Sequence, residues 1–508
     1  MLFNSLSFYI FFPIVTLGYF LLPHRFRWAW LLAASAYFYM AFVPYYILIL
    51  CVTILIDYIS GLAIERAEGA RRKRFLILSL AANLGMLGFF KYFNFFNANV
   101  EALAQWIGWN YPIPALNILL PIGLSFHTFQ SMAYTIEVYR GHQSAERHLG
   151  ILALYVLFYP QLVAGPIERP GHMLPHFHVE HKFDYQNAAD GLRLMAWGFF
   201  KKLVIADRLA LLVDPIYADP RQYPGPLHFL AMMAIAYQVY CDFSGYSDIA
   251  IGAARVMGYR LMTNFDRPFS SRSMSEFWTR WNISLSSWFR DYFYISLGGN
   301  RVSRPRYYLN VFLTFLASGL WHGASWNFVI WGGLHGLFVL IEIWTKNLRA
   351  ALASRVTLRL RSTQALAGRA STLLRLFQNL TVFLLVAFAC IFFRAASLDD
   401  AFYIVTHLFS GYNLAQIPLL LEVIRATLGA NFPLAILFSS LTGAQVLAIV
   451  AAEILFMEAV QYFQKQNPLE RVLAGQRAIL RWGAYYALLL NILLFGAFSQ
   501  TTFIYFQF

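Results

Sequence analysis

The chain has 508 residues, of which 59% are hydrophobic and only 13% are charged, whereas soluble domains average about 45–50% and about 25%. So few charged side chains cannot cover the surface of about three or four soluble domains, which excludes a soluble globular enzyme. The composition indicates a polytopic membrane protein. The net charge of +14 fits the positive-inside bias of cytoplasmic loops, and no nucleic-acid partner is expected. The three cysteines lie singly in apolar stretches and predict neither disulfides nor a metal site.

We expect an all-α fold, because a helix of about 20 apolar residues crosses the hydrocarbon core of a bilayer. About eleven segments have this character. They are residues 8–22, 28–42, 45–63, 75–92, 149–163, 227–241, 307–320, 327–344, 376–393, 444–462 and 482–498. The first has no basic flank and no small-residue cleavage site, so we expect it to be retained.

Three further apolar stretches contain proline, glycine or charged residues, namely 116–139, 190–212 and 275–297. Such segments are tolerated at membrane depth only where they are buried in protein or line a wet cavity. We therefore expect re-entrant or interfacial helices that form a central funnel. The whole chain, residues 1–508, is predicted to be a single integral membrane domain, with its core motifs at about 120–340.

The basic residues of short loops predict the orientation in the membrane. Residues 65–74 contain five basic side chains, and residues 346–375 contain seven with no Asp or Glu. Both segments, and residues 24–27, are expected on the cytoplasmic side, which places the N-terminus outside. The 346–375 segment reads either as a solvated linker, the interpretation that we favour, or as an amphipathic helix on anionic headgroups.

The strongest local motif is GLWHGASWNFVIWGGLHG at residues 319–336. His322 stands between Trp321 and Gly323 at the end of a predicted span, and an ionisable residue at membrane depth is a functional candidate. A packed histidine bonded to a carbonyl explains these residues equally well. His335 follows thirteen residues later, about 220° round an ideal helix. It therefore does not share a face of one continuous helix with His322, and a packing role is favoured.

A second motif at residues 273–301 interleaves aromatic and polar side chains. Its candidates for the funnel lining are Arg280, Trp281, Arg290 and Asp291. The two arginines can neutralise a phosphate-bearing donor, and Asn282 can donate a hydrogen bond to a developing oxyanion. On these residues alone, an interfacial helix with snorkelling arginines and an aromatic belt is favoured.

Two other polar stretches are less specific. Residues 237–252 include Asp242 and Ser244 after an apolar segment, where we expect them to cap a new helix and to line the cavity. Four histidines lie between His172 and His181. Pro175 is expected to break the helix that would align them, so a polar surface loop is favoured over a metal site.

Taken together, these stretches resemble the membrane-bound O-acyltransferase family, and within it the bacterial alginate O-acetyltransferases and the teichoic-acid D-alanyl transfer proteins. The matching segments are residues 120–141, 164–166, 242–252, 276–301, 319–323, 391–395 and 503–508. The resemblance implies that His322 is the catalytic histidine, in a membrane funnel open to a cytoplasmic thioester. Many bacterial members have a second histidine at the position of Asn282. Other branches of the superfamily have asparagine there, as this chain does, and an amide cannot act as a base.

The resemblance also implies the reaction. An acyl group, most simply acetyl, would pass from acetyl-CoA or an acyl-carrier thioester toward a hydroxyl of an extracytoplasmic polysaccharide such as alginate or cellulose. His322 would act as general base and Asn282 as an orienting or oxyanion-stabilising amide, with no metal and no tightly bound cofactor. Expected partners are an SGNH-type extracytoplasmic acyltransferase, the polysaccharide biosynthesis machinery and the lipid bilayer of a bacterial inner membrane. The alternatives are D-alanyl transfer to a teichoic-acid-type polymer, a transporter or flippase, and a non-catalytic scaffold.

Overall fold

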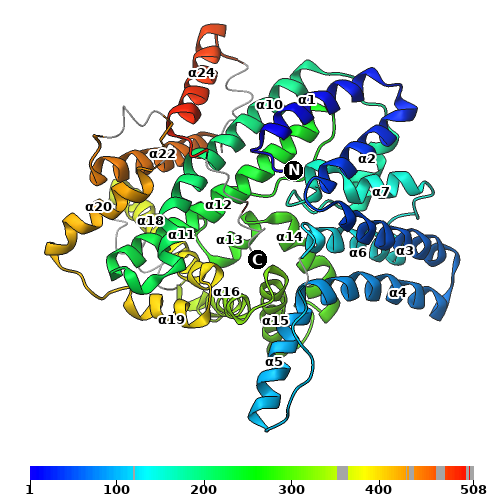
Figure 1. The fold of residues 1–508 in the computed structure, drawn as a ribbon, viewed down its shortest axis with the longest axis horizontal. Helices are drawn as coiled ribbons and strands as arrows, with labels where there is room; N and C mark the ends of the chain where they lie inside the picture. The colour runs from blue at the N-terminus through cyan, green and yellow to red at the C-terminus, as the bar shows by residue number, and fades with distance from the viewer. Residues whose placement is uncertain are drawn as a thin grey trace. The chain divides into compact units, whose positions relative to one another are not determined.

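The computed structural model describes the chain except residues 118–119, 350, 352–363, 431, 434–439, 465–474, 499–502 and 504–508. The described residues form helices joined by loops, and no β-strand occurs among them (Figure 1). The all-α prediction is confirmed.

Six described helical segments are long and apolar enough to cross a membrane, which confirms a multi-pass membrane protein. They are Pro44–Arg66, Gly69–Trp106, Trp326–Trp344, Thr372–Arg394, Gly443–Gln464 and Ala478–Phe495. The first five each contain one of the predicted spans, and the last covers the predicted span 482–498 up to Phe495. The N-terminal prediction corresponds to a shorter apolar helix, α1 (Leu6–Leu21). The total of eleven spans is not confirmed.

One predicted span is divided in the structure. Residues 149–163 form the short helices α7 (Leu149–Leu157) and α8 (Tyr159–Leu162). Phe158 between them has φ −51° and ψ 112°, outside the helical region, and Pro160 lies in the first turn of α8. The nine residues of α7 are too few to cross the hydrocarbon core. The apolar character of this stretch instead reflects burial inside the protein.

The chain divides into two compact units, which are described separately. Unit 1 contains residues 1–198 and 246–263. Its remaining main helices are α2 (His24–Met40), α3 (Ile47–Arg66), α4 (Gly69–Leu87), α5 (Phe93–Trp106), α6 (Leu124–Arg140), α9 (Pro170–His178) and α10 (Tyr185–Phe199). Helix α3 packs against α4, α6 and α7. A buried polar network joins α3 to α4, where Asp57 Oδ1 lies 2.6 Å from Ser79 Oγ and accepts a hydrogen bond of 2.9 Å from Asn83.

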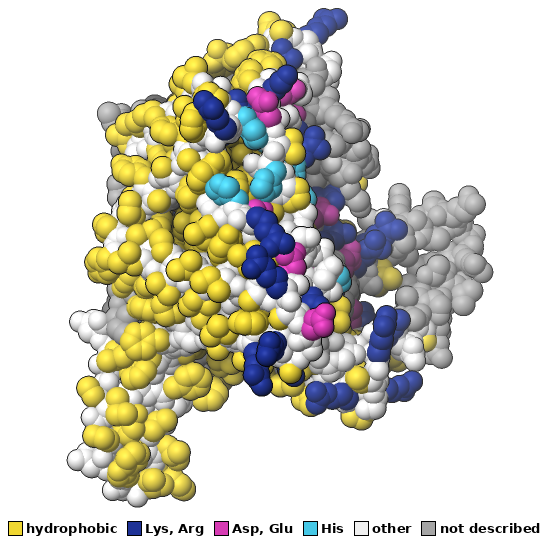
Figure 2. All heavy atoms as spheres, turned by 90° about the vertical axis from the view of Figure 1, so that its right-hand side faces the viewer, with side chains coloured by type: hydrophobic (Ala, Val, Ile, Leu, Met, Phe, Trp, Pro, Cys, Tyr) yellow, Lys and Arg dark blue, Asp and Glu magenta, His cyan; other side chains and the backbone are white. Residues whose placement is uncertain are grey.

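Loops that were predicted to share one side of the membrane come together at one end of unit 1. Arg147 forms an ion pair with Glu65, and the ring of His148 lies 4.5 Å from that of Trp28. Arg27 donates a hydrogen bond of 2.6 Å to the carbonyl of His181. Figure 2 shows charged and histidine side chains along one border of a mainly hydrophobic face. This arrangement fits a common membrane side for residues 24–27 and 65–74; which side that is stays a prediction.

Unit 2 contains residues 199–245 and 264–504. Its helices are η3 (Phe200–Ala206), α11 (Asp207–Ala218), the first part of α12 (Gly225–Val256), α13 (Met274–Arg280), α14 (Ile283–Trp288), η6 (Phe289–Tyr294), α15 (Arg304–His322), α16 (Trp326–Trp344), α18 (Gln364–Arg394), α19 (Leu398–His407), α20 (Ile417–Leu428), α22 (Gly443–Gln464) and α24 (Ala478–Phe495). Helices α15 and α16 lie side by side (Figure 1), and α16 also packs against α13 and α18.

Two of the three stretches that were predicted to be irregular interrupt regular α-helix. The third, 116–139, differs, because from Leu124 onward it is the uninterrupted helix α6. Residues 190–212 include the π-helical turns of η3 between α10 and α11. Residues 275–297 are divided into α13, α14, the π-helical η6 and a final 3₁₀ turn. Wide π turns often mark functional sites. Whether these segments line a funnel stays a prediction.

The basic segment 346–375 is only partly described. Residues 350 and 352–363 lie outside the described residues, whereas 364–375 form the first turns of α18. The linker interpretation is therefore wrong for 364–375, because these residues continue the helix of the following span. The terminal motif at 503–508 lies outside the described residues apart from Phe503.

Candidate active site

The hairpin of α15 and α16 in unit 2 positions His322. His322 is the last residue of α15, and α16 begins four residues later at Trp326. A Cβ on Gly319 would lie 2.3 Å from the carbonyl oxygen of Phe328, and a Cβ on Gly332 would lie 2.4 Å from that of Phe315. Only glycine permits this approach of the two backbones. The two glycines therefore set how the C-terminal end of α15 meets α16.

His322 lies in a buried group of rings that we call the histidine cluster, which consists of Trp278, His322, Trp331, His335 and Phe393. The ring of Trp331 is central, with centroids 4.9 Å from His322, 4.7 Å from His335 and 5.4 Å from Phe393. Trp278 lies 4.9 Å from His335. His322 and Trp331 are each 5% exposed and His335 is 1% exposed, so these three rings are almost closed to bulk water.

The two histidines of the motif therefore stand on different helices, and both contact Trp331. This agrees with the prediction that they do not share one helix face. Trp321, the other predicted member of the site, is buried with its ring 4.9 Å from that of His322.

Helix α18, which carries Phe393 of the histidine cluster, is tied to α16 near its end. Asn327, in the first turn of α16, donates a hydrogen bond of 2.8 Å to the carbonyl of Ala395, just after α18. This bond holds Phe393 against His322, at a centroid distance of 5.6 Å. His322 also stands at the C-terminal end of α15, where the helix dipole is negative.

A cavity of about 250 Å³ lies next to the histidine cluster, between α13, α14 and α15. Its lining includes Trp278, Ser286, Ser287, Arg290, Phe315 and Ser318. Trp278 belongs to both the cavity and the histidine cluster, and Ser318 stands one helical turn before His322 on α15. Pockets for drug-sized ligands measure about 300–1,000 Å³. This cavity therefore has room for a small acyl group with part of its carrier.

Asn282 connects α13 to α14 in the left-handed conformation, with φ 41°. Asparagine adopts this backbone geometry more readily than most other residues. Its side chain is 1% exposed, and Oδ1 has no hydrogen-bond partner in the described part of the chain. No hydrogen bond between Asn282 and His322 is found among the described residues. The residue thus has a backbone role as well as an unsatisfied buried acceptor.

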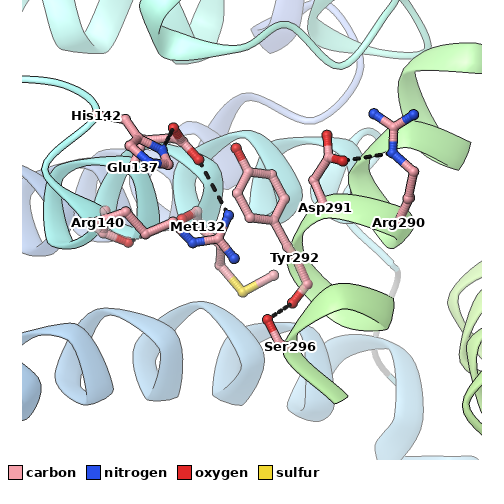
Figure 3. Close-up of polar contacts among 9 residues, drawn as sticks. Met132, Glu137, Arg140, His142, Arg290, Asp291, Tyr292 and Ser296 are labelled. Carbon is pink, nitrogen blue, oxygen red and sulfur yellow. Dashed lines mark hydrogen bonds and ion pairs between the residues drawn. The ribbon is translucent and has the colours of Figure 1, made fainter. Parts of the chain in front are cut away.

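The remaining predicted residues of the second motif have partners nearby. Arg280 pairs with Glu276 at 2.6 Å on α13, and Arg290 pairs with Asp291 at 2.7 Å (Figure 3). Trp281 is buried against Phe265 and Phe277, and Phe277 in turn contacts Trp278 of the histidine cluster. Among these residues, Arg290 lines the cavity.

Asp242 and Ser244 are bound by two successive lysines of η3. Lys202 Nζ lies 2.6 Å from Asp242 Oδ1 and 2.8 Å from Asp207 Oδ1, and Lys201 donates a hydrogen bond of 2.9 Å to Ser244 Oγ. The predicted helix cap at these positions is wrong, because α12 runs without interruption from Gly225 to Val256. The lysines, not a helix terminus, satisfy the polar side chains.

The histidine-rich segment also differs from expectation, because α9 continues through Pro175. The ring removes one backbone donor, and burial of Met173, Leu174 and Phe177 holds the helix together. The imidazoles bond in different directions, His172 and His178 to the carboxylates of Glu168 and Glu146 and His181 to the carbonyl of His176. No group of three or more metal-ligating side chains occurs within the described ranges.

Two residues of the histidine cluster were not singled out from the sequence. Trp331 precedes His335 by four residues on α16, so the helical repeat places both on one face. This spacing can be recognised in the sequence. Phe393 comes from a helix that follows a long basic segment, and nothing local predicts its contact with His322.

The model of the membrane-bound O-acyltransferase family matches residues 142–387, which include every member of the histidine cluster except Phe393. The chain is 40% identical over 415 residues to a "Probable alginate O-acetylase AlgI" of Azotobacter vinelandii, covering 81% of this chain and 78% of that protein. It is 35% identical over 375 residues to a "Peptidoglycan O-acetyltransferase" of Helicobacter pylori, covering 67% and 70%. A "Teichoic acid D-alanyltransferase" of Bacillus subtilis is 27% identical over 263 residues, covering 48% and 65%.

Proposed function

The chain belongs to the membrane-bound O-acyltransferase family, and from this premise we propose that it moves an acetyl group from a cytoplasmic thioester toward a hydroxyl of an extracytoplasmic polysaccharide, with His322 as general base. The observation that carries the proposal is the placement of His322. It is a buried imidazole at a helix C-terminus, held by rings from two other helices beside a cavity of about 250 Å³.

In the proposed reaction, Nε2 or Nδ1 of His322 accepts the proton of the acceptor hydroxyl while the hydroxyl oxygen attacks the thioester carbon. The tetrahedral intermediate then collapses, the carbon–sulfur bond breaks, and the thiolate takes up the proton from the imidazolium. General-base catalysis of this kind contributes about 10²–10⁴-fold. The negative end of the α15 dipole stabilises the imidazolium that forms between the two steps.

The predicted lining residues support substrate binding in different ways. Arg290 at the cavity can neutralise a phosphate on the donor, since its side chain is 65% exposed even in the pair with Asp291. Asn282, with its unsatisfied amide oxygen, is proposed to orient the attacking hydroxyl or, through its NH₂ group, to stabilise the oxyanion. Lining roles for Arg280, Trp281, Trp321, His335, Asp242 and Ser244 remain predictions.

The acceptor and the partners are proposed from the relatives. Their names connect them to alginate, peptidoglycan and teichoic acid, and the larger coverage by the Azotobacter protein favours an alginate-like exopolysaccharide. An SGNH-type acyltransferase is proposed to complete the transfer outside a bacterial inner membrane. D-Alanyl transfer from a carrier protein is the second candidate, supported by the Bacillus relative.

The first experiment is acyl transfer in proteoliposomes with radiolabelled acetyl-CoA, comparing the wild type with His322→Ala. We expect the variant to lose about 10²–10⁴-fold in rate at equal protein level. His142→Ala, which removes an exposed imidazole of unit 1, should retain the wild-type rate. Equal turnover by His322→Ala would contradict the assignment of the base. A wild type that is active only with a D-alanyl carrier-protein thioester would favour the second candidate.

The role of Asn282 is tested with a variant that keeps its backbone conformation but lacks its side-chain amide. Asn282→Gly keeps the left-handed conformation available but removes the side chain. Loss of an amide that acts on the reacting groups lowers the rate by about 10²–10³-fold. If Asn282→Gly turns over like the wild type, asparagine is present for its backbone conformation alone.

A further inference from the structure

Three ring nitrogens of the histidine cluster have no hydrogen-bond partner among the described residues. They are Nε1 of Trp278, Nε1 of Trp331 and Nδ1 of His335, all buried. More than about 90% of buried polar groups in proteins are paired. Three unpaired nitrogens in one group of touching rings indicate a site that a bound group completes.

The chemistry of these nitrogens restricts what that group can be. An indole N–H only donates and has no lone pair to accept a hydrogen bond. Two of the three nitrogens belong to indoles, so the missing group must present an acceptor. A carbonyl oxygen, and more strongly an oxyanion, meets this requirement.

Trp331 is the indole closest to the proposed base. Its ring lies 4.9 Å from His322, whereas Trp278 contacts Trp331 at 5.9 Å and His335 at 4.9 Å and faces the cavity. With 5% of its surface exposed, Trp331 is screened from water, which would otherwise compete for the N–H. Trp331 is therefore the donor best placed to act on an atom that reacts at His322.

We propose that the indole N–H of Trp331 donates a hydrogen bond to the oxyanion of the tetrahedral intermediate. This assignment rests on the proposed function. When the hydroxyl oxygen bonds to the thioester carbon, the π electrons of the carbonyl move to its oxygen, and the Trp331 proton binds that charge without being transferred. Breakage of the carbon–sulfur bond restores the carbonyl and releases the hydrogen bond.

The packing of α15 on α16 makes this donor rigid. Gly332 adjoins Trp331, and Gly319 stands one turn before His322, and both touch the backbone of the opposite helix. Base and donor are thus fixed relative to each other before substrate binds. A donor fixed in a water-excluded site needs no reorganisation as the charge develops, which is why such groups accelerate acyl transfer.

The test removes the N–H and keeps the ring shape. Benzothienylalanine, in which sulfur replaces the indole N–H, is incorporated at position 331 of the full chain and compared with the wild type in proteoliposomes. We expect kcat to fall about 10²–10³-fold with little change in KM for the donor. The same analogue at Trp344, which is 55% exposed on the same helix, should leave kcat within about twofold of the wild type. Trp331→Phe, which retains an aromatic ring, should reproduce the loss of kcat.

The outcomes separate this inference from the proposed function. If benzothienylalanine at 331 leaves kcat within about twofold while His322→Ala is inactive, the reaction stands and the role of Trp331 is overturned. A rise in KM at unchanged kcat also overturns it, because the N–H then binds the ground state equally well. If His322→Ala is as active as the wild type, the proposed function itself fails.

Discussion

At the scale of single residues, Lys202 shows how this chain accommodates charge inside an apolar protein. Lys202 is 7% exposed, and its ammonium group lies between the carboxylates of Asp207 and Asp242. A buried ion pair adds little net stability over an apolar replacement, but removal of one partner is costly because a buried charge loses its counterion. Lys202 is therefore expected to matter for the stability of the fold.

Lys202→Met is expected to lower the free energy of unfolding by about 3–5 kcal/mol, because two buried carboxylates lose their lysine. Thermal unfolding in detergent measures the change. Lys182→Met, at an exposed position, should be neutral. Adding Asp207→Asn and Asp242→Asn to Lys202→Met should recover part of the loss. An unchanged unfolding temperature in the single variant would contradict the importance of the ion pairs.

His172 provides a pH-dependent contact on unit 1. Its hydrogen bond to the buried carboxylate of Glu168 raises the pKa of His172 above its usual 6.5, although partial burial opposes the shift. Since the pKa is raised in the folded state, the contact is fully stabilising below about pH 6.5 and is lost as the pH rises through the folded-state pKa.

A titration of histidine-labelled protein by NMR should therefore find the His172 midpoint above 6.5. Glu168→Gln, which keeps an acceptor but removes the charge, should lower that midpoint. His176, whose pKa is lowered by burial and by the neighbouring His172 and His181, is the internal comparison and should titrate below 6.5. A His172 midpoint that Glu168→Gln leaves unchanged would contradict the ion pair.

At the scale of elements, the α15–α16 hairpin matters most for the site. The sequence predicts both helices from their apolar character, and it has glycines at 319, 332, 333 and 336. It does not tell which glycines face the partner helix. The structure shows that Gly319 and Gly332 contact backbone, whereas a Cβ on Gly333 would meet only side-chain carbons at 3.7 Å or more.

Gly319→Ala and Gly332→Ala should each destabilise the protein by about 1–3 kcal/mol, since the added methyl group meets a carbonyl oxygen that cannot move away alone. Separation of the helices also shifts His322 from Trp331, and a misplacement of about 1 Å can cost about 10²-fold in rate. Acyl transfer and thermal unfolding measure the two effects. Gly333→Ala is the matched control and should be neutral or stabilising, because alanine favours helix. Equal behaviour of all three variants would contradict the packing argument.

The broken helices were predicted as re-entrant or interfacial helices, but where each one breaks was not predicted. Charges and glycines within apolar stretches mark 190–212 and 275–297 as unusual, but they do not distinguish a re-entrant loop from a π turn. Which of the two forms depends on contacts with residues far away in the chain, such as the ion pair between Lys202 of η3 and Asp242 of α12. At position 282 the backbone is left-handed, a conformation that favours asparagine. A comparison of motifs does not reveal this preference.

At the scale of the whole molecule, the basic segments predict how the protein is oriented in the membrane. The basic segments 24–27 and 65–74 lie at one end of unit 1, joined through the 141–148 loop. The excess of Lys and Arg predicts that this end is cytoplasmic, where a thioester donor would also be found.

Single cysteines in a cysteine-free background test this orientation with an impermeant maleimide on intact cells. Arg25→Cys and Arg71→Cys should react only after the membrane is opened, because both are predicted to face the cytoplasm. Ala41→Cys, exposed at the other end of α2, should react from outside. The reverse pattern would invert the predicted topology.

The sequence by itself determined the membrane class, the all-α fold, six of the spans and the family, because apolar runs and motifs are local properties that survive any arrangement of the helices. It also singled out His322. Only the tertiary structure decided that Trp331 and Phe393 surround that histidine, that Lys202 joins Asp207 to Asp242, and that Gly319 and Gly332 set the helix contact. These are contacts between helices far apart in the chain, and they depend on how side chains fit together in space, which no local pattern records.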